Sequence, residues 1–152
     1  MIAPFTVYAA NVVLVLALAI CVVTDLRSRH IYDVVTLSAL GVGIGLHFLG
    51  GWLELQSSLL GTTVAAAPFL AAFFFGWMAD GDVKLMAAAG ALKGWPFALG
   101  LLLAVSIAGG LQGILWIAAA RLRKKPAPKH LPYGVAIATG ALVSLLVEYN
   151  VV

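Results

Sequence analysis

The sequence predicts an all-α fold, a polytopic membrane bundle of about six transmembrane helices forming one domain over residues 1–152. Composition is the first reason: 63% of residues are hydrophobic, only 10% are charged, and the mean hydropathy is +1.08. A soluble domain carries about 25% charged residues, so this chain cannot cover itself with a water-compatible surface. The second reason is that the apolar residues form runs close to the roughly 20 residues a helix needs to cross a bilayer.

Six candidate spans follow one another along the chain, at about 4–24, 31 (or 34)–49, 59–78, 82–92, 96–120 and 131–147. Glycines four residues apart in two of them, Gly41 with Gly45 and Gly109 with Gly113, predict close helix packing. The fourth span is unusual because it has only 11 residues, about half a membrane thickness at 1.5 Å per residue. It could cross, re-enter or not insert at all.

Charge distribution favours the crossing. If 82–92 crosses, Arg27, Arg29, Lys84 and the five basic residues of 121–129 share one side, with Lys93 alone opposite. Basic loops mark the cytoplasmic side, so we expect six spans with the N-terminus outside. The same rule makes the 121–129 cluster a solvated loop, and no nucleic-acid partner is expected despite the net charge of +3.

Two aspartates stand out in this topology. Asp25 ends a helix that runs inward and Asp82 begins a helix that runs outward, so both are expected at the same depth near the cytoplasmic face. Ionisable groups at such positions indicate function. Two adjacent carboxyls tend to share one proton, which suits hydrolysis of a peptide bond by an activated water.

Neighbouring residues are assigned supporting roles. Gly81 is expected to let the backbone turn sharply or approach a substrate closely before Asp82. Lys84 is expected to steady a carboxylate or a substrate carbonyl, or to snorkel to the interface. Asp80, two residues from Asp82 and therefore on another helix face, is expected to be an N-cap or a solvated acid. Asp33 is expected to cap the second helix.

Other interpretations stay open on spacing alone. Asp25 could pair with Arg27 or Arg29 and Asp82 with Lys84, both simply ending spans. Alternatively the acids could serve a proton-coupled or ion-conducting site.

Metal and cofactor sites are not expected. The three histidines, His30, His47 and His130, show no ligand spacing, and the single Cys21 excludes an internal disulfide. Glu54 and Glu148 fall on the outer side, where no chemistry is expected.

Three stretches together resemble the type IV prepilin peptidase family, the GxGD-type intramembrane aspartyl proteases. The run Gly81-Asp82-Val83-Lys84-Leu85 is similar to the GxGD motif, with Ala79 where the family has its first glycine. The stretch from Asp25 to Asp33 is similar to the first-aspartate segment, and Pro132-Tyr133-Gly134 to the segment that opens the last span.

The resemblance implies a membrane aspartyl endopeptidase with Asp25 and Asp82 as catalytic pair and Gly81 and Lys84 in support. It implies removal of the basic leader of prepilins or pseudopilins at the cytoplasmic face of the bacterial inner membrane, without cofactor or metal. Larger members add a domain with paired cysteines that N-methylates the new terminus, so this chain looks like the small, peptidase-only type of Flp/Tad pilus systems. The alternative is a non-enzymatic component, a proton-linked transporter or a pilus assembly factor. No oligomeric state follows from the sequence.

Overall fold

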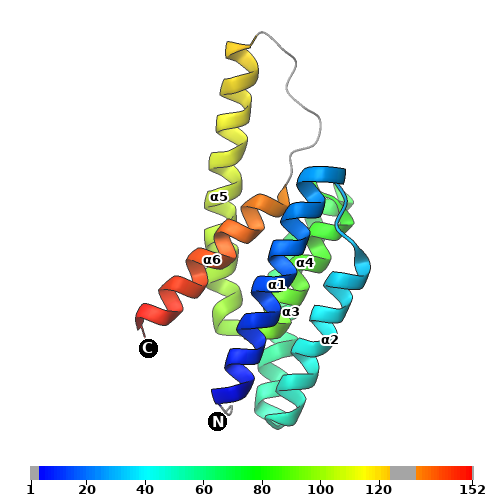
Figure 1. The fold of residues 1–152 in the computed structure, drawn as a ribbon, viewed down its shortest axis with the longest axis vertical. Helices are drawn as coiled ribbons and strands as arrows, with labels where there is room; N and C mark the ends of the chain where they lie inside the picture. The colour runs from blue at the N-terminus through cyan, green and yellow to red at the C-terminus, as the bar shows by residue number, and fades with distance from the viewer. Residues whose placement is uncertain (1–3, 124–132, 152) are drawn as a thin grey trace.

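The computed structural model describes residues 4–123 and 133–151, all of whose regular structure is α-helical (Figure 1). The six helices, listed in chain order, are α1 (Pro4–Ser28), α2 (Asp33–Leu49), α3 (Trp52–Phe74), α4 (Asp80–Lys93), α5 (Trp95–Leu122) and α6 (Tyr133–Val151). The predicted all-α fold and helix number are thereby confirmed. The basic residues Lys124, Lys125 and Lys129, His130 and the expected start of the last span at Leu131 lie outside the described residues.

Helix boundaries differ from the predictions mainly in α3, which begins at Trp52 instead of residue 59 and ends at Phe74 instead of Met78. Pro68 lies inside the helix without ending it. The helix stops just before Gly76, whose φ of 72° favours glycine. The earlier stop leaves a short connection before α4, so Asp82 is presented from the first turn of a new helix.

The short helix α4 lies at the centre of the bundle and packs against all five other helices. Nine of its fourteen residues are buried, and many are alanines, whose small side chains let neighbouring helices approach. At Gly90, a Cβ would overlap the Gly61 carbonyl oxygen of α3. Backbone contact between α3 and α4 therefore depends on glycine on both sides.

The predicted packing role of Gly41 and Gly45 is wrong. A Cβ at either position would meet nothing within 4 Å, whereas one at Gly43, between them, would lie 2.7 Å from the Leu92 nitrogen of α4. The spacing of small residues indicated a close approach, but only the rotation of α2 decides which glycine faces its neighbour.

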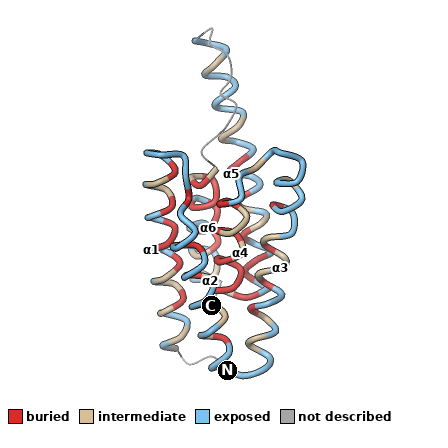
Figure 2. Tube along the Cα trace, turned by 90° about the vertical axis from the view of Figure 1, so that its right-hand side faces the viewer, coloured by how far each residue is buried: buried red, intermediate tan, exposed pale blue. Residues whose placement is uncertain are grey.

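Four helices, α1, α3, α5 and α6, are long and apolar enough to cross a membrane. Buried residues gather inside the bundle and exposed ones outside it (Figure 2), and the exposed set includes large apolar side chains such as Leu103 and Ile107. An apolar exterior is the surface expected of a membrane protein. Helix α2 has 17 residues and α4 has 14, about 21 Å at 1.5 Å per residue.

Candidate active site

The two aspartates singled out in the sequence lie at the same end of the bundle. Asp25 belongs to the last turn of α1 and Asp82 to the first turn of α4, and Figure 1 shows α1 ending where α4 begins. Both residues are buried, with 7% and 6% of their surface exposed. The two carboxyl groups lie within electrostatic range of each other, and both lie within range of the Cys21 thiol one turn before Asp25. The fold therefore brings together two carboxyl groups that are 57 positions apart in the chain.

Helix α6 holds the Asp25 carboxylate. The Gly134 N–H donates a hydrogen bond of 3.0 Å to Asp25 Oδ2, and a Cβ on residue 134 would lie 2.8 Å from that same oxygen. Gly134 is in the first turn of α6, where backbone N–H groups lack helical partners and favour negative charge. The site therefore needs glycine here, a role that the sequence reasoning missed although Gly134 closes the Pro-Tyr-Gly run.

Gly81 serves close packing and no sharp turn. It is helical and buried, its φ is not positive, and a Cβ would lie 2.8 Å from the Ile31 Cβ. The expected turning role is thus wrong, and glycine is needed because Ile31 presses against the start of α4. Ala79 before it has φ −83° and ψ 155°, an extended conformation that alanine adopts without strain.

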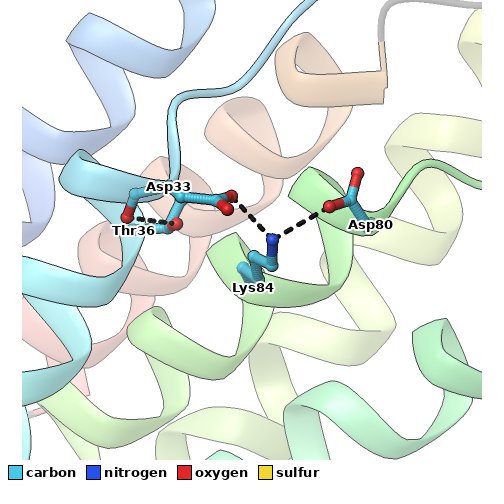
Figure 3. A network of polar contacts seen from close by, with 4 residues as sticks. All are labelled: Asp33, Thr36, Asp80 and Lys84. Atoms are coloured by element: carbon cyan, nitrogen blue, oxygen red, sulfur yellow. Dashed lines mark hydrogen bonds and ion pairs between the residues drawn. The ribbon is translucent and has the colours of Figure 1, made fainter.

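Lys84 pairs with two carboxylates that are not the buried ones. Its Nζ lies 2.6 Å from Asp33 Oδ1 and 2.9 Å from Asp80 Oδ2 (Figure 3). The alternative in which Asp82 pairs with Lys84 is therefore wrong. Because Asp33 opens α2 and Asp80 opens α4, Lys84 joins the first turns of the two helices on the outer side of the site.

Neither Asp33 nor Asp80 is the N-cap residue that the sequence suggested. Tyr32 takes the N-cap position of α2 and Ala79 that of α4. Asp80 is instead a solvated acid, the other role expected from the sequence, with 62% of its side chain exposed.

Asp25 does not pair with its neighbouring arginines. Arg27 and Arg29 are exposed, and among the described residues no ion pair joins either of them to Asp25. The end of α1 is fixed instead by Arg29, whose φ of 51° breaks the helix, and by the Gly134 hydrogen bond.

Tyr133 forms a further wall of the site. Its ring packs edge to face on Phe69 of α3 with centroids 6.0 Å apart, its hydroxyl contacts Gly109 of α5, and it lies within electrostatic range of Asp82. Within the described residues, no group of three or more His, Cys, Asp and Glu side chains is arranged to hold a metal ion.

Comparison with known proteins places this arrangement in a family. The family model described as the type IV leader peptidase family matches residues 12–114. This chain belongs to that family. The matched region of this leader peptidase family member runs from α1 through most of α5 and includes both buried aspartates.

Curated relatives carry the name prepilin leader peptidase/N-methyltransferase. The one from Pectobacterium carotovorum is 27% identical over 86% of this chain and 48% of its own length. Those from Aeromonas hydrophila and Burkholderia pseudomallei are 32% and 27% identical over 80% of this chain and 43% and 40% of their own. The chain thus spans less than half the length of these relatives. No solved structure matches it.

Proposed function

We propose that this chain is an aspartic-type endopeptidase that removes the leader of prepilin or pseudopilin substrates, with Asp25 and Asp82 as its catalytic pair. The observation that supports the proposal is that two buried carboxyls lie within electrostatic range of each other at one end of the bundle. The names of the curated relatives supply the substrate class. Leader cleavage is peptide-bond hydrolysis, for which a carboxyl pair sharing one proton is suited.

The environments of the two acids suggest their roles. The Gly134 N–H and the start of α6 favour a charged Asp25, while Asp82 lies buried without an ion pair to Lys84. We therefore assign the carboxylate to Asp25 and the shared proton to Asp82.

The reaction then follows in two steps. Asp25 takes a proton from a water whose oxygen attacks the carbonyl carbon, and Asp82 gives its proton to the carbonyl oxygen. When the tetrahedral intermediate collapses, Asp25 passes its proton to the leaving amine nitrogen and the C–N bond breaks. Asp82 recovers its proton from the new carboxyl group, so the pair returns to its starting state.

The proposed membrane location and orientation of the chain follow from its charge distribution and hydropathy. We place the chain in the bacterial inner membrane with its N-terminus outside and the carboxyl pair near the cytoplasmic face, because the basic residues favour that orientation. Gly81 and Lys84 support the pair from α4. The proposed activity is leader cleavage in a pilus system of the Flp/Tad kind.

Co-expression with a candidate prepilin tests the proposal, with leader removal followed on a gel. Asp25→Asn and Asp82→Asn should each slow processing at least about a hundredfold. Asp80→Asn is the matched control, because the same change in an exposed acid two residues from Asp82 should leave processing within a few-fold of native.

Two results would contradict the proposal. Normal processing by Asp25→Asn would mean that another acid completes the site. A folded native chain that leaves every plausible prepilin uncut would favour the non-enzymatic alternative, a transporter or assembly factor.

A further inference from the structure

A second polar cluster lies at the opposite end of α4. Lys93, the last residue of α4, keeps only 4% of its side chain exposed. Burying a lysine costs free energy unless its charge is paired and hydrogen-bonded. The contacts of Lys93 therefore indicate what its burial does for the fold. The sequence had indicated only that Lys93 stands apart from the other basic residues.

Lys93 contacts three other helices at once. Its Nζ lies 2.7 Å from Glu148 Oε2 of α6, donates a 2.8 Å hydrogen bond to Asn11 Oδ1 of α1, and sits 5.4 Å from the ring centre of Phe97 of α5. Glu148, expected to take no part in the chemistry, is therefore the counter-ion of a buried charge.

The helices that Lys93 joins by polar contacts are the ones that build the candidate active site. Helix α4 carries Asp82, α1 carries Asp25, and α6 carries the Gly134 N–H that holds Asp25. From Lys93 to Asp82 is 11 residues, about 16 Å along the helix, and Asn11 and Glu148 are each 14 residues, about 21 Å, from Asp25 and Gly134. The Lys93 ammonium group thus joins α1, α4 and α6 at the ends that lie away from the candidate active site.

A polar tie can fix the axial position of α4, whose buried residues include several alanines and glycines. Near Lys93, a second polar contact between helices is the Ser58 hydroxyl bond to the Ala91 carbonyl of α4, at 2.8 Å. Buried ion pairs are best known for fixing register rather than for adding stability.

We propose that Lys93 is a positioning residue for hydrolysis, which sets the axial position of α4 relative to α1 and α6 and so aligns Asp82 with Asp25. This inference rests on the proposed peptidase function. Lys93 does not touch the carboxyls and acts only through the helices it joins. A shift of about 1 Å at a reacting group can cost a hundredfold in rate.

The test measures kcat and KM for leader removal by purified protein, corrected for the folded fraction, together with the melting temperature. Lys93→Met should lower kcat about tenfold to a hundredfold with KM within about twofold. Glu148→Gln, a milder change at a half-exposed acid, should lower kcat a few-fold and keeps the test valid should Lys93→Met fail to fold.

Charge exchange supplies the decisive comparison. Lys93→Glu and Glu148→Lys should each be impaired, whereas the double variant should recover at least a third of native kcat, since the Asn11 amide can turn to donate to the new carboxylate. Arg121→Met, which removes an exposed cation in the last turn of α5, is the matched control and should behave as native.

The outcomes separate this inference from the function it rests on. A native chain that cuts prepilin while folded Lys93→Met or Glu148→Gln cuts with unchanged kcat overturns the positioning role alone. Loss of kcat in the single variants without recovery in the double variant also overturns it, because the pair itself would then be irrelevant. A folded native chain that cuts nothing overturns the peptidase proposal, and the positioning role falls with it.

Discussion

Gly134 and Asp25 show at the scale of single residues how little space the site leaves. The amide nitrogen and the carboxylate oxygen are 3.0 Å apart, and a methyl group on residue 134 would fall 2.8 Å from that oxygen. Contacts below 3.0 Å require a neighbour to move, and the neighbour here is the carboxylate itself. A side chain at this position would therefore displace one of the two proposed catalytic groups.

Gly134→Ala should accordingly lower kcat for leader removal at least about tenfold while the chain still folds, because misplacing a reacting group by a fraction of an ångström weakens catalysis. Gly100→Ala is the control, since a Cβ there meets nothing within 4 Å. Native activity of Gly134→Ala, measured beside that control, would show that the contact with Asp25 does not matter for the reaction.

Lys84 makes its ion pairs on the solvent side of the site, and exposed pairs contribute little. Lys84→Met should therefore lower processing only about three- to tenfold, by loosening the first turn of α4 against α2. Lys84→Arg should keep most of it, because the guanidinium can reach Asp33 and Asp80 as well. A loss as complete as that of Asp82→Asn in the same gel assay would instead indicate that Lys84 touches the substrate.

At the scale of elements, α4 can lie at the centre of the bundle because it is short and rich in small side chains. It has 14 residues, it packs against all the other helices, and glycines at Gly43, Gly61 and Gly90 let backbones come together. Polar contacts hold it at both ends, Lys84 with Asp33 and Asp80 at its start and Lys93 with Asn11 and Glu148 at its end. A helix placed in this way can present Asp82 at a defined position.

Gly90→Ala should destabilise the protein by about 1–3 kcal/mol, the usual result of overpacking a close-packed interior, because its methyl group would meet the Gly61 backbone. Unfolding in detergent, monitored by circular dichroism, measures the change. Gly45→Ala, which adds the same methyl group to open space on α2, should leave the protein at least as stable as native, because alanine favours a helix over glycine by up to about 1 kcal/mol. Equal effects of the two substitutions would mean that the α3–α4 contact can relax freely.

At the scale of the whole molecule, helix length and the positions of the basic residues determine how the chain crosses the bilayer. Four helices are long enough to span, and α4 is shorter but shielded by its neighbours. A short helix surrounded by protein does not need to match the hydrocarbon thickness, since lipid does not contact most of its surface. The basic residues then favour the six-span arrangement.

Topology reporters give a clear test of this arrangement. Green fluorescent protein fused after residue 125 should fluoresce, because the loop is expected in the cytoplasm, and alkaline phosphatase fused after residue 51 should be active outside. If α4 does not cross, the fusion after residue 125 should be dark and a phosphatase at the same position active. That pattern would place the basic loop opposite Arg27 and Arg29.

The sequence alone determined the membrane class, the number of helices and the two aspartates that the fold brings together. These are properties of composition and of local runs of apolar residues, which directly determine whether a segment inserts into a membrane. The sequence did not show which glycines pack against a neighbouring helix, or which residues Lys84, Asp33 and Glu148 contact. Each of these depends on the rotation of one helix against another.

Only the tertiary structure decided the contacts that join distant parts of the chain. Gly134 meets Asp25 across 109 positions, Lys93 meets Asn11 across 82, and Lys84 meets Asp33 across 51. No local pattern specifies such partners, because they follow from the packing of whole helices. The carboxyl pair itself belongs to both levels: its residues are visible in the sequence, and their meeting is a consequence of the bundle.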